Sequence, residues 1–178
     1  EPSLTYLFVT LALLIVLSGF FSSAETSMLS LNKYRLKHLK RTGHKGALKA
    51  SQLLERTDQL ISVILIGNNF VNILASAIAT VIAIQLWGDA GIAIATAALT
   101  LIILIFAEIT PKTIAAYNPE KIAFPAAHIL KPLLKLFYPL VWAINLITNN
   151  LLRLLGFDTK ENNMSNLSRE ELKTLVNE

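Results

Sequence analysis

The sequence predicts an all-α membrane protein with three transmembrane helices and a set of cytoplasmic juxtamembrane, or belt, helices. Three observations lead to this prediction. The 178-residue chain is 53% hydrophobic, whereas soluble domains are nearer 45–50%. Three uncharged stretches are each about as long as a membrane crossing, which takes about 20 apolar residues. Half of the 16 basic residues lie in a single loop between the first two stretches.

The elements follow in order along the chain. The first span is expected at about residues 4–31, because no charge occurs from Pro2 to Ala24. It is interpreted as a retained helix and not as a signal peptide, since no basic segment precedes it. A basic helical hairpin is expected at about 33–56, where leucines alternate with basic residues. The second and third spans are expected at about 59–87 and 90–116.

The stretch from about 119 to 156 is apolar but is interrupted by Pro125, Pro132 and Pro139 and by several lysines. It is interpreted as broken amphipathic belt helices at the inner interface, because the prolines divide it into pieces too short to span. Fourth and fifth crossings are the alternative. The transmembrane domain is therefore assigned to residues 1–156. Residues 157–178 are interpreted as a linker and the start of a cytosolic helix, opened by the capping-box pattern Ser168 to Glu171.

Charge predicts the orientation of the chain. Basic loops stay on the cytoplasmic side of membranes, so the hairpin is placed inside and the N-terminus outside. The C-terminus is then cytoplasmic, in an inner or plasma membrane of the cell. The same placement argues against nucleic acid as a partner, because the basic residues mark a loop between spans. The basic residues of this loop are Lys33, Arg35, Lys37, Lys40, Arg41, Lys45, Lys49 and Arg56.

Each predicted span also carries polar residues. Polar side chains in hydrocarbon are costly, and an ionised carboxylate costs about 2.5–3.5 kcal/mol on insertion scales, so these groups are expected to face the bundle interior. All offer oxygen, which suits hard cations such as Mg²⁺, Ca²⁺ and Na⁺. The chain has no cysteine, and its histidines lie outside the spans. The polar residues are Ser22, Ser23, Glu25, Thr26 and Ser27 in the first span, Asn68, Asn69 and Asn72 in the second, and Glu108 and Thr110 in the third.

Asn68 and Asn72 are four residues apart and share a helix face, whereas Asn69 points elsewhere. Pro111 has no N–H and is expected to free the carbonyl of Ala107, beside Glu108. Together these groups form a candidate cation site. Simple helix-to-helix hydrogen bonding is the alternative for the serines and asparagines. Glu25 is expected to bind the ion or to pair at the inner interface with Lys112 or a loop lysine.

Three segments carry a resemblance to a known family. The segments FFSSAET at 20–26, GNNFVN at 67–72 and AEITPKT at 107–113 are similar to the signature segments of the CorC/CNNM (cyclin M) transmembrane domain. The resemblance covers about residues 4–156. It implies a homodimeric secondary transporter that exports Mg²⁺ in exchange for Na⁺. It also implies that Ser22 or Ser23, Asn68, Asn72 and Glu108 line the ion site.

The resemblance further implies that the last helix leads toward a cytosolic regulatory pair of CBS domains, which this chain does not include. The sequence leaves open a second function, a Mg²⁺-sensing membrane anchor that signals to a cytosolic domain or partner without transporting the ion. An intramembrane enzyme is not expected, because no span holds a His–carboxylate pair or paired aspartates.

Overall fold

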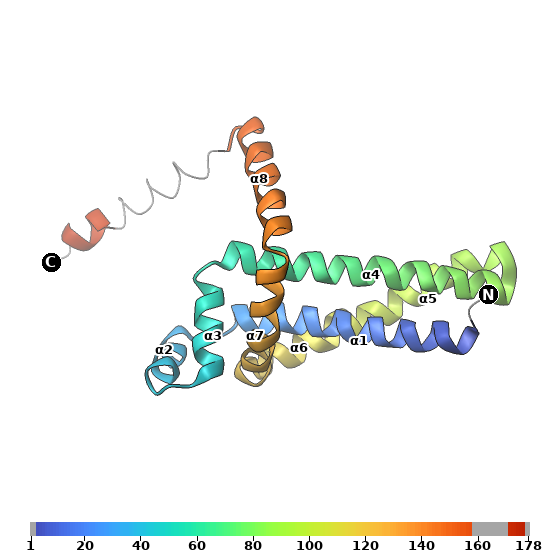
Figure 1. The fold of residues 1–178 in the computed structure, drawn as a ribbon, viewed down its shortest axis with the longest axis horizontal. Coiled ribbons are helices and arrows are strands. Elements are labelled where there is room, and N and C mark those ends of the chain that lie inside the picture. The colour runs from blue at the N-terminus through green and yellow to red at the C-terminus, as the bar shows by residue number, and fades with distance from the viewer. Residues whose placement is uncertain (1–2, 158–170, 177–178) are drawn as a thin grey trace. The chain divides into compact units, whose positions relative to one another are not determined.

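The computed structural model describes residues 3–157 and 171–176, and the regular elements within them are all helical (Figure 1). The chain divides into two units. Residues 1–137 form the first unit and residues 138–178 the second. The all-α membrane class predicted from the sequence is confirmed. The capping box expected at 168–171 falls almost entirely outside the described residues.

The first membrane helix is α1, Leu4–Leu29. Ser3 caps it, since its Oγ accepts the Tyr6 N–H at 3.3 Å. Its 26 residues extend about 39 Å at 1.5 Å per residue. The helix ends two residues before the expected end. The reason is local: Asn32 adopts an extended conformation and accepts the N–H groups of Tyr34 and Arg35, which starts a new helix.

The basic hairpin consists of α2, Lys33–Arg41, and α3, Lys45–Leu54. Between them Gly43 has φ +84°, a left-handed conformation that glycine adopts without strain. The side chain of His44 caps α3 by accepting the Ala47 N–H at Nδ1, 3.1 Å away. On α2, Arg35 forms an ion pair with Glu120, which lies in a later helix, Pro119–Leu136.

The stretch Thr57–Tyr117 is, with α1, long and apolar enough to cross a membrane. As one straight helix its 61 residues would extend about 92 Å, three times the roughly 30 Å hydrocarbon core. It instead reverses at η1, Gly88–Ala90, where Gly88 has φ +67°. Thus α4, Thr57–Trp87, and α5, Gly91–Ile102, run antiparallel and side by side (Figure 1). With α1 this makes three crossings.

The third crossing is not a uniform α-helix. After α5 comes η2, Ile103–Ile109, which is a π-helix, and then α6, Thr110–Tyr117.

Close approach of the helices depends on small residues, which let backbones pack closely within a membrane. The described alanines whose relative exposure is 0% are Ala24, Ala47, Ala50, Ala107, Ala115, Ala123 and Ala127.

Helix α7, Pro119–Leu136, corrects one expectation. The prolines at 125 and 132 lie inside it and do not break it. Each removes a single backbone donor, and the helix is held by burial of one face, including Phe124 and Leu130, where it lies against α3 and α1. The break comes at Phe137. In the second unit, α8 covers Tyr138–Leu154. Among the described residues, α7 and α8 qualify as a membrane span only when taken together.

The orientation can be tested with single cysteines, since the natural chain has none. Asp89 in the α4–α5 turn and Thr42 in the α2–α3 turn are both exposed. With the basic hairpin inside, a membrane-impermeant maleimide should label Asp89→Cys in intact cells. It should label Thr42→Cys only after the membrane is permeabilised. The reverse pattern would invert the topology.

Candidate functional site

A cluster of oxygen atoms joins α1 to α4 in the middle of the spanning region. The Ser18 Oγ lies 3.0 Å from the Asn68 Oδ1 and 2.6 Å from the Asn72 Oδ1. Ser18 is 1% exposed. A serine hydroxyl carries one proton, so it can donate to only one of these carbonyl oxygens at a time. Three oxygens therefore converge with a single proton between them, an arrangement that a small cation would satisfy.

Ser22 lies one helical turn beyond Ser18 on the same face of α1. Its side chain has no exposed surface. Within the described part of the chain, its Oγ has no hydrogen-bond partner. A buried hydroxyl left unsatisfied costs about 1–3 kcal/mol. The Ser22 hydroxyl is therefore available to bind a ligand that also contacts the oxygen cluster of Ser18, Asn68 and Asn72.

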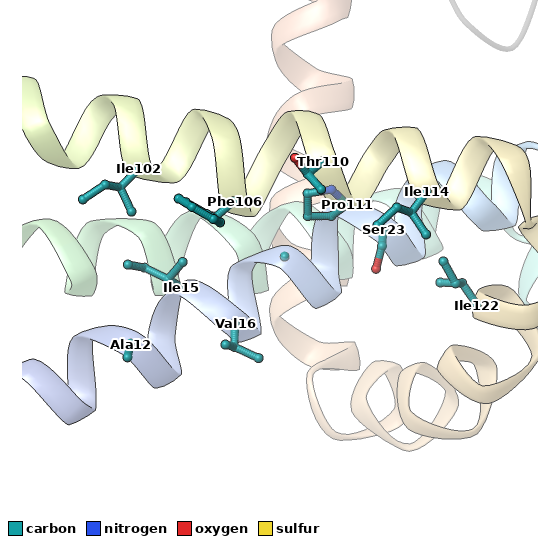
Figure 2. Close-up of a pocket in the computed structure, with 11 residues that line it drawn as sticks. Ala12, Ile15, Val16, Ser23, Ile102, Phe106, Thr110, Pro111, Ile114 and Ile122 are labelled. Atoms are coloured by element: carbon teal, nitrogen blue, oxygen red, sulfur yellow. The ribbon is translucent and has the colours of Figure 1, made fainter.

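Ser23 lies elsewhere. Its hydroxyl donates to the Phe20 carbonyl at 3.0 Å. The side chain lines an apolar cavity of about 620 Å³ between α1 and the η2–α6 segment, beside Pro111 and Ile114 (Figure 2). The sequence left open which of the two serines faces the ion. Of the two, Ser22 is the serine that lies on the helix face of Ser18.

The π-helix changes which backbone oxygens Pro111 frees. The Thr110 N–H donates to the Ile105 carbonyl, five residues back. In this register the next donor, to the Phe106 carbonyl, would come from Pro111, which has no N–H. The expectation of a freed Ala107 carbonyl therefore extends to Phe106. The Phe106 oxygen lies against α1, 3.5 Å from where a Cβ on Gly19 would stand. The tighter neighbour of Gly19 is the Pro111 ring, whose Cγ lies 3.3 Å from the same point, so an added methyl group would press on Pro111.

Glu108 stands apart from the oxygen cluster. Its carboxylate pairs with the Lys112 ammonium at 3.2 Å, and its side chain is 26% exposed. Lys112, one of the alternative partners expected for Glu25, is thus paired within the third crossing, where Glu108 and Lys112 are neighbours on one helix face. Glu108 lies in a cavity of about 310 Å³ that Ser76, Thr96 and Thr100 also line. Ser76 is one turn from Asn72 on α4, so the Glu108 cavity and the oxygen cluster occupy adjacent turns.

The remaining polar residues of the spans have local roles or face outward. The Ser27 hydroxyl is buried and donates to the Ala24 carbonyl at 3.1 Å. Asn69 is exposed, as its position relative to Asn68 predicts, and Glu25 and Thr26 are half-buried. Sequence reasoning missed Ser18, which sits alone in an apolar run. Its spacing of four residues from Ser22 is the signal that could have identified it.

Over the described residues, no three His, Cys, Asp or Glu side chains gather in a way that could hold a metal ion. The donors of the cluster are neutral amide and hydroxyl oxygens instead. Such donors suit a hard cation held weakly enough to be released.

Comparison with known proteins assigns this chain to one family. The family described as "Cyclin M transmembrane N-terminal domain" matches residues 8–178. A "UPF0053 protein" of Haemophilus influenzae is 53% identical over 175 residues, which is 98% of this chain and 41% of that protein. The "UPF0053 inner membrane protein YfjD" of Escherichia coli is 51% identical over 162 residues, 91% of this chain and 38% of that protein.

A "Polyamine export protein" of Haemophilus influenzae is 33% identical over 159 residues, covering 82% of this chain and 37% of that protein. The chain thus spans about two fifths of the length of these relatives. The family match, over residues 8–178, includes Ser18, Asn68 and Asn72 of the oxygen cluster.

The Ser18 contacts predict a stability effect. Ser18→Ala removes the donor shared by Asn68 and Asn72 and leaves two half-buried carbonyl oxygens unsatisfied. We expect a loss of about 1–2 kcal/mol in the free energy of unfolding, measured by thermal or denaturant unfolding in detergent. Ser27→Ala is the matched control, because that buried hydroxyl bonds only within its own helix. Equal effects of the two substitutions would argue against an interhelical role for Ser18.

Proposed function

This chain belongs to the cyclin M transmembrane N-terminal domain family, and we propose that it is the membrane part of a secondary transporter that exports Mg²⁺ in exchange for Na⁺. The family comprises membrane proteins of transporter type, and relatives of this chain carry names that include an inner membrane protein and polyamine export proteins. The identity of the transported ion and of its counter-ion is our proposal.

The observation that carries the proposal is the convergence of the Ser18, Asn68 and Asn72 oxygens on one point, with the unpaired Ser22 hydroxyl one turn away. Mg²⁺ takes about six oxygen ligands and gives up its water reluctantly. Three or four neutral oxygens and a freed backbone carbonyl would replace part of that water. The rest of the shell would stay hydrated, so that the ion can leave again.

Glu108 supplies the negative charge in this proposal. In the described conformation Lys112 neutralises the carboxylate. We propose that Glu108 exchanges Lys112 for the transported ion, while the lysine extends toward the headgroups. The π-helix that contains Glu108 provides a way for this side chain to rotate from Lys112 to the ion. A π segment holds one extra residue, so its return to α geometry would rotate one flank against the other by about 100°.

A second cargo is suggested by the relatives named polyamine export proteins. Amide and hydroxyl oxygens also accept hydrogen bonds from ammonium groups. Two features favour the metal ion. The oxygens converge on a single point and do not form a row. Apart from Asp58 in the first turn of α4, Glu25 and Glu108 are the acidic residues of the three spanning segments. A polyamine carries several separated charges, which call for several separated carboxylates.

We also propose that two copies of the chain form the transporter. Polar groups exposed on a spanning helix are costly in hydrocarbon. The cavity that holds Glu108 is lined by the exposed residues Ser76, Thr96 and Thr100, and Asn69 is exposed on the same helix as Ser76. A second copy packed on this side of α4 and α5 would remove these groups from lipid. Homodimers with two-fold symmetry are the commonest assemblies.

Transport is tested in proteoliposomes that enclose a Mg²⁺ indicator, with a Na⁺ gradient imposed. Asn72→Ala and Glu108→Gln should each reduce Mg²⁺ flux by more than about tenfold, because each removes an ion ligand. Ser27→Ala is the control and should retain flux, since the Ser27 hydroxyl bonds only to the Ala24 carbonyl of its own helix. Normal flux in both ligand variants would refute the assignment.

The same preparation separates the alternatives. Mg²⁺ binding by calorimetry without flux in any gradient would favour the sensing function. Flux of spermidine that Mg²⁺ does not inhibit would favour polyamine export.

The dimer is tested by cross-linking. A bifunctional maleimide should join two copies of the Ser76→Cys chain in membranes, since Ser76 lies on the proposed interface. Val16→Cys is the control: Val16 is 71% exposed on α1, away from that side of α4. Cross-linking at Val16 and none at Ser76 would place the interface elsewhere.

A further inference from the structure

A separate cavity of about 610 Å³ lies where α1, α2, α3 and α4 meet, at the end of the spanning helices that bears the basic hairpin. Its wall has two chemical faces. One face is basic and comes from α2: Lys33, Lys37 and Lys40. The other is apolar and includes Met28, Leu31 and Leu54. Neither face belongs to the oxygen cluster between α1 and α4.

The three lysines share one side of α2, because they are spaced by four and three residues. Arg35 lies between them in sequence but forms its ion pair with Glu120 on α7. Among the described residues, none of these lysines lies within ion-pair distance of a carboxylate. Glu55 contributes the acidic group of the cavity wall. The wall therefore carries a net charge of +2 from three ammonium groups and one carboxylate.

We propose that this cavity binds an anionic phospholipid. The phosphate would lie on Lys33, Lys37 and Lys40, and one acyl chain would lie along the apolar face. Charge complementarity supports an anionic headgroup. The adjoining leucines, which a free phosphate would not use, support a lipid.

The position of the cavity also fits a lipid. It adjoins the ends of α1 and α4, where the uncharged stretches give way to the basic hairpin. This is the depth at which headgroups lie, and basic clusters beside a spanning helix are attracted to anionic lipid surfaces. A lipid bound here would contact the two helices that carry the oxygen cluster as well as the hairpin. This inference does not depend on which ion the protein transports.

The test uses the purified chain in neutral detergent, with phosphatidylglycerol or phosphatidylcholine of identical acyl chains added. Native mass spectrometry counts the lipids retained. We expect one phosphatidylglycerol per protomer, preferred over phosphatidylcholine by about tenfold or more. The triple variant Lys33→Gln, Lys37→Gln, Lys40→Gln should lose this preference. Circular dichroism and gel filtration establish that it remains folded, as expected for exposed side chains.

A second triple variant is the matched control. Lys45→Gln, Lys121→Gln, Lys135→Gln removes the same charge from exposed lysines outside the cavity, and it should keep the preference. Equal losses in the two triple variants would replace the site with diffuse electrostatic attraction and overturn the proposal.

Glu55→Gln gives an effect of opposite sign that misfolding cannot imitate. It should increase phosphatidylglycerol retention, because it removes the one repulsive charge of the wall. No increase, together with unchanged binding in the cavity variant, would refute the site. Displacement of the lipid by sn-glycerol 3-phosphate, which has the headgroup charge and no acyl chain, would identify a soluble phosphate site instead and overturn the lipid assignment.

Discussion

Polar side chains at the centre of a bilayer must find their partners within the protein, and the contact between α1 and α4 is the principal expression of that constraint here. The Ser18 hydroxyl lies within hydrogen-bonding distance of both Asn68 and Asn72 and so fixes the rotation of one helix against the other. Once that rotation is set, Ser22 is buried and, among the described residues, has no hydrogen-bond partner, while Ser23 faces the cavity beside Pro111 and Ile114. The same bonds that hold the helices together leave an excess of oxygen at one point, which is the property a cation site requires.

The third crossing packs against α1 through a segment with irregular backbone, the π-helix η2. The π-helix and Pro111 together leave the Phe106 carbonyl without a donor from the next turn, and Gly19 of α1 leaves room for the Pro111 ring beside it. Unsatisfied carbonyls at membrane depth are tolerated where they line a cavity or lie buried in protein. The local irregularity therefore lies where the third crossing packs against α1. The regular helical parts of the three crossings position this irregular segment within the membrane.

Charge is distributed by a different rule. The basic residues of the hairpin lie outside the hydrocarbon, where Arg35 ties α2 to α7 and the neighbouring lysines line a cavity. Within the spans, the ion pair between Glu108 and Lys112 keeps a carboxylate next to lipid at tolerable cost. The molecule thus separates a nearly neutral oxygen site in the bilayer from a strongly basic surface at one face of it. The first suits a small cation and the second an anionic headgroup.

The sequence by itself determined the all-α membrane class, the three uncharged spans, the basic hairpin and the family, because hydropathy, charge and short motifs are local properties. It also placed Asn68 and Asn72 on one helix face, since helical periodicity is local too. Only the tertiary structure decided what that face meets. The partner is Ser18, a residue that no local pattern marked, and Glu108 turns to Lys112 instead of joining the cluster. The reason is physical: periodicity defines a face, but the rotation of one helix against another depends on packing between residues distant in sequence.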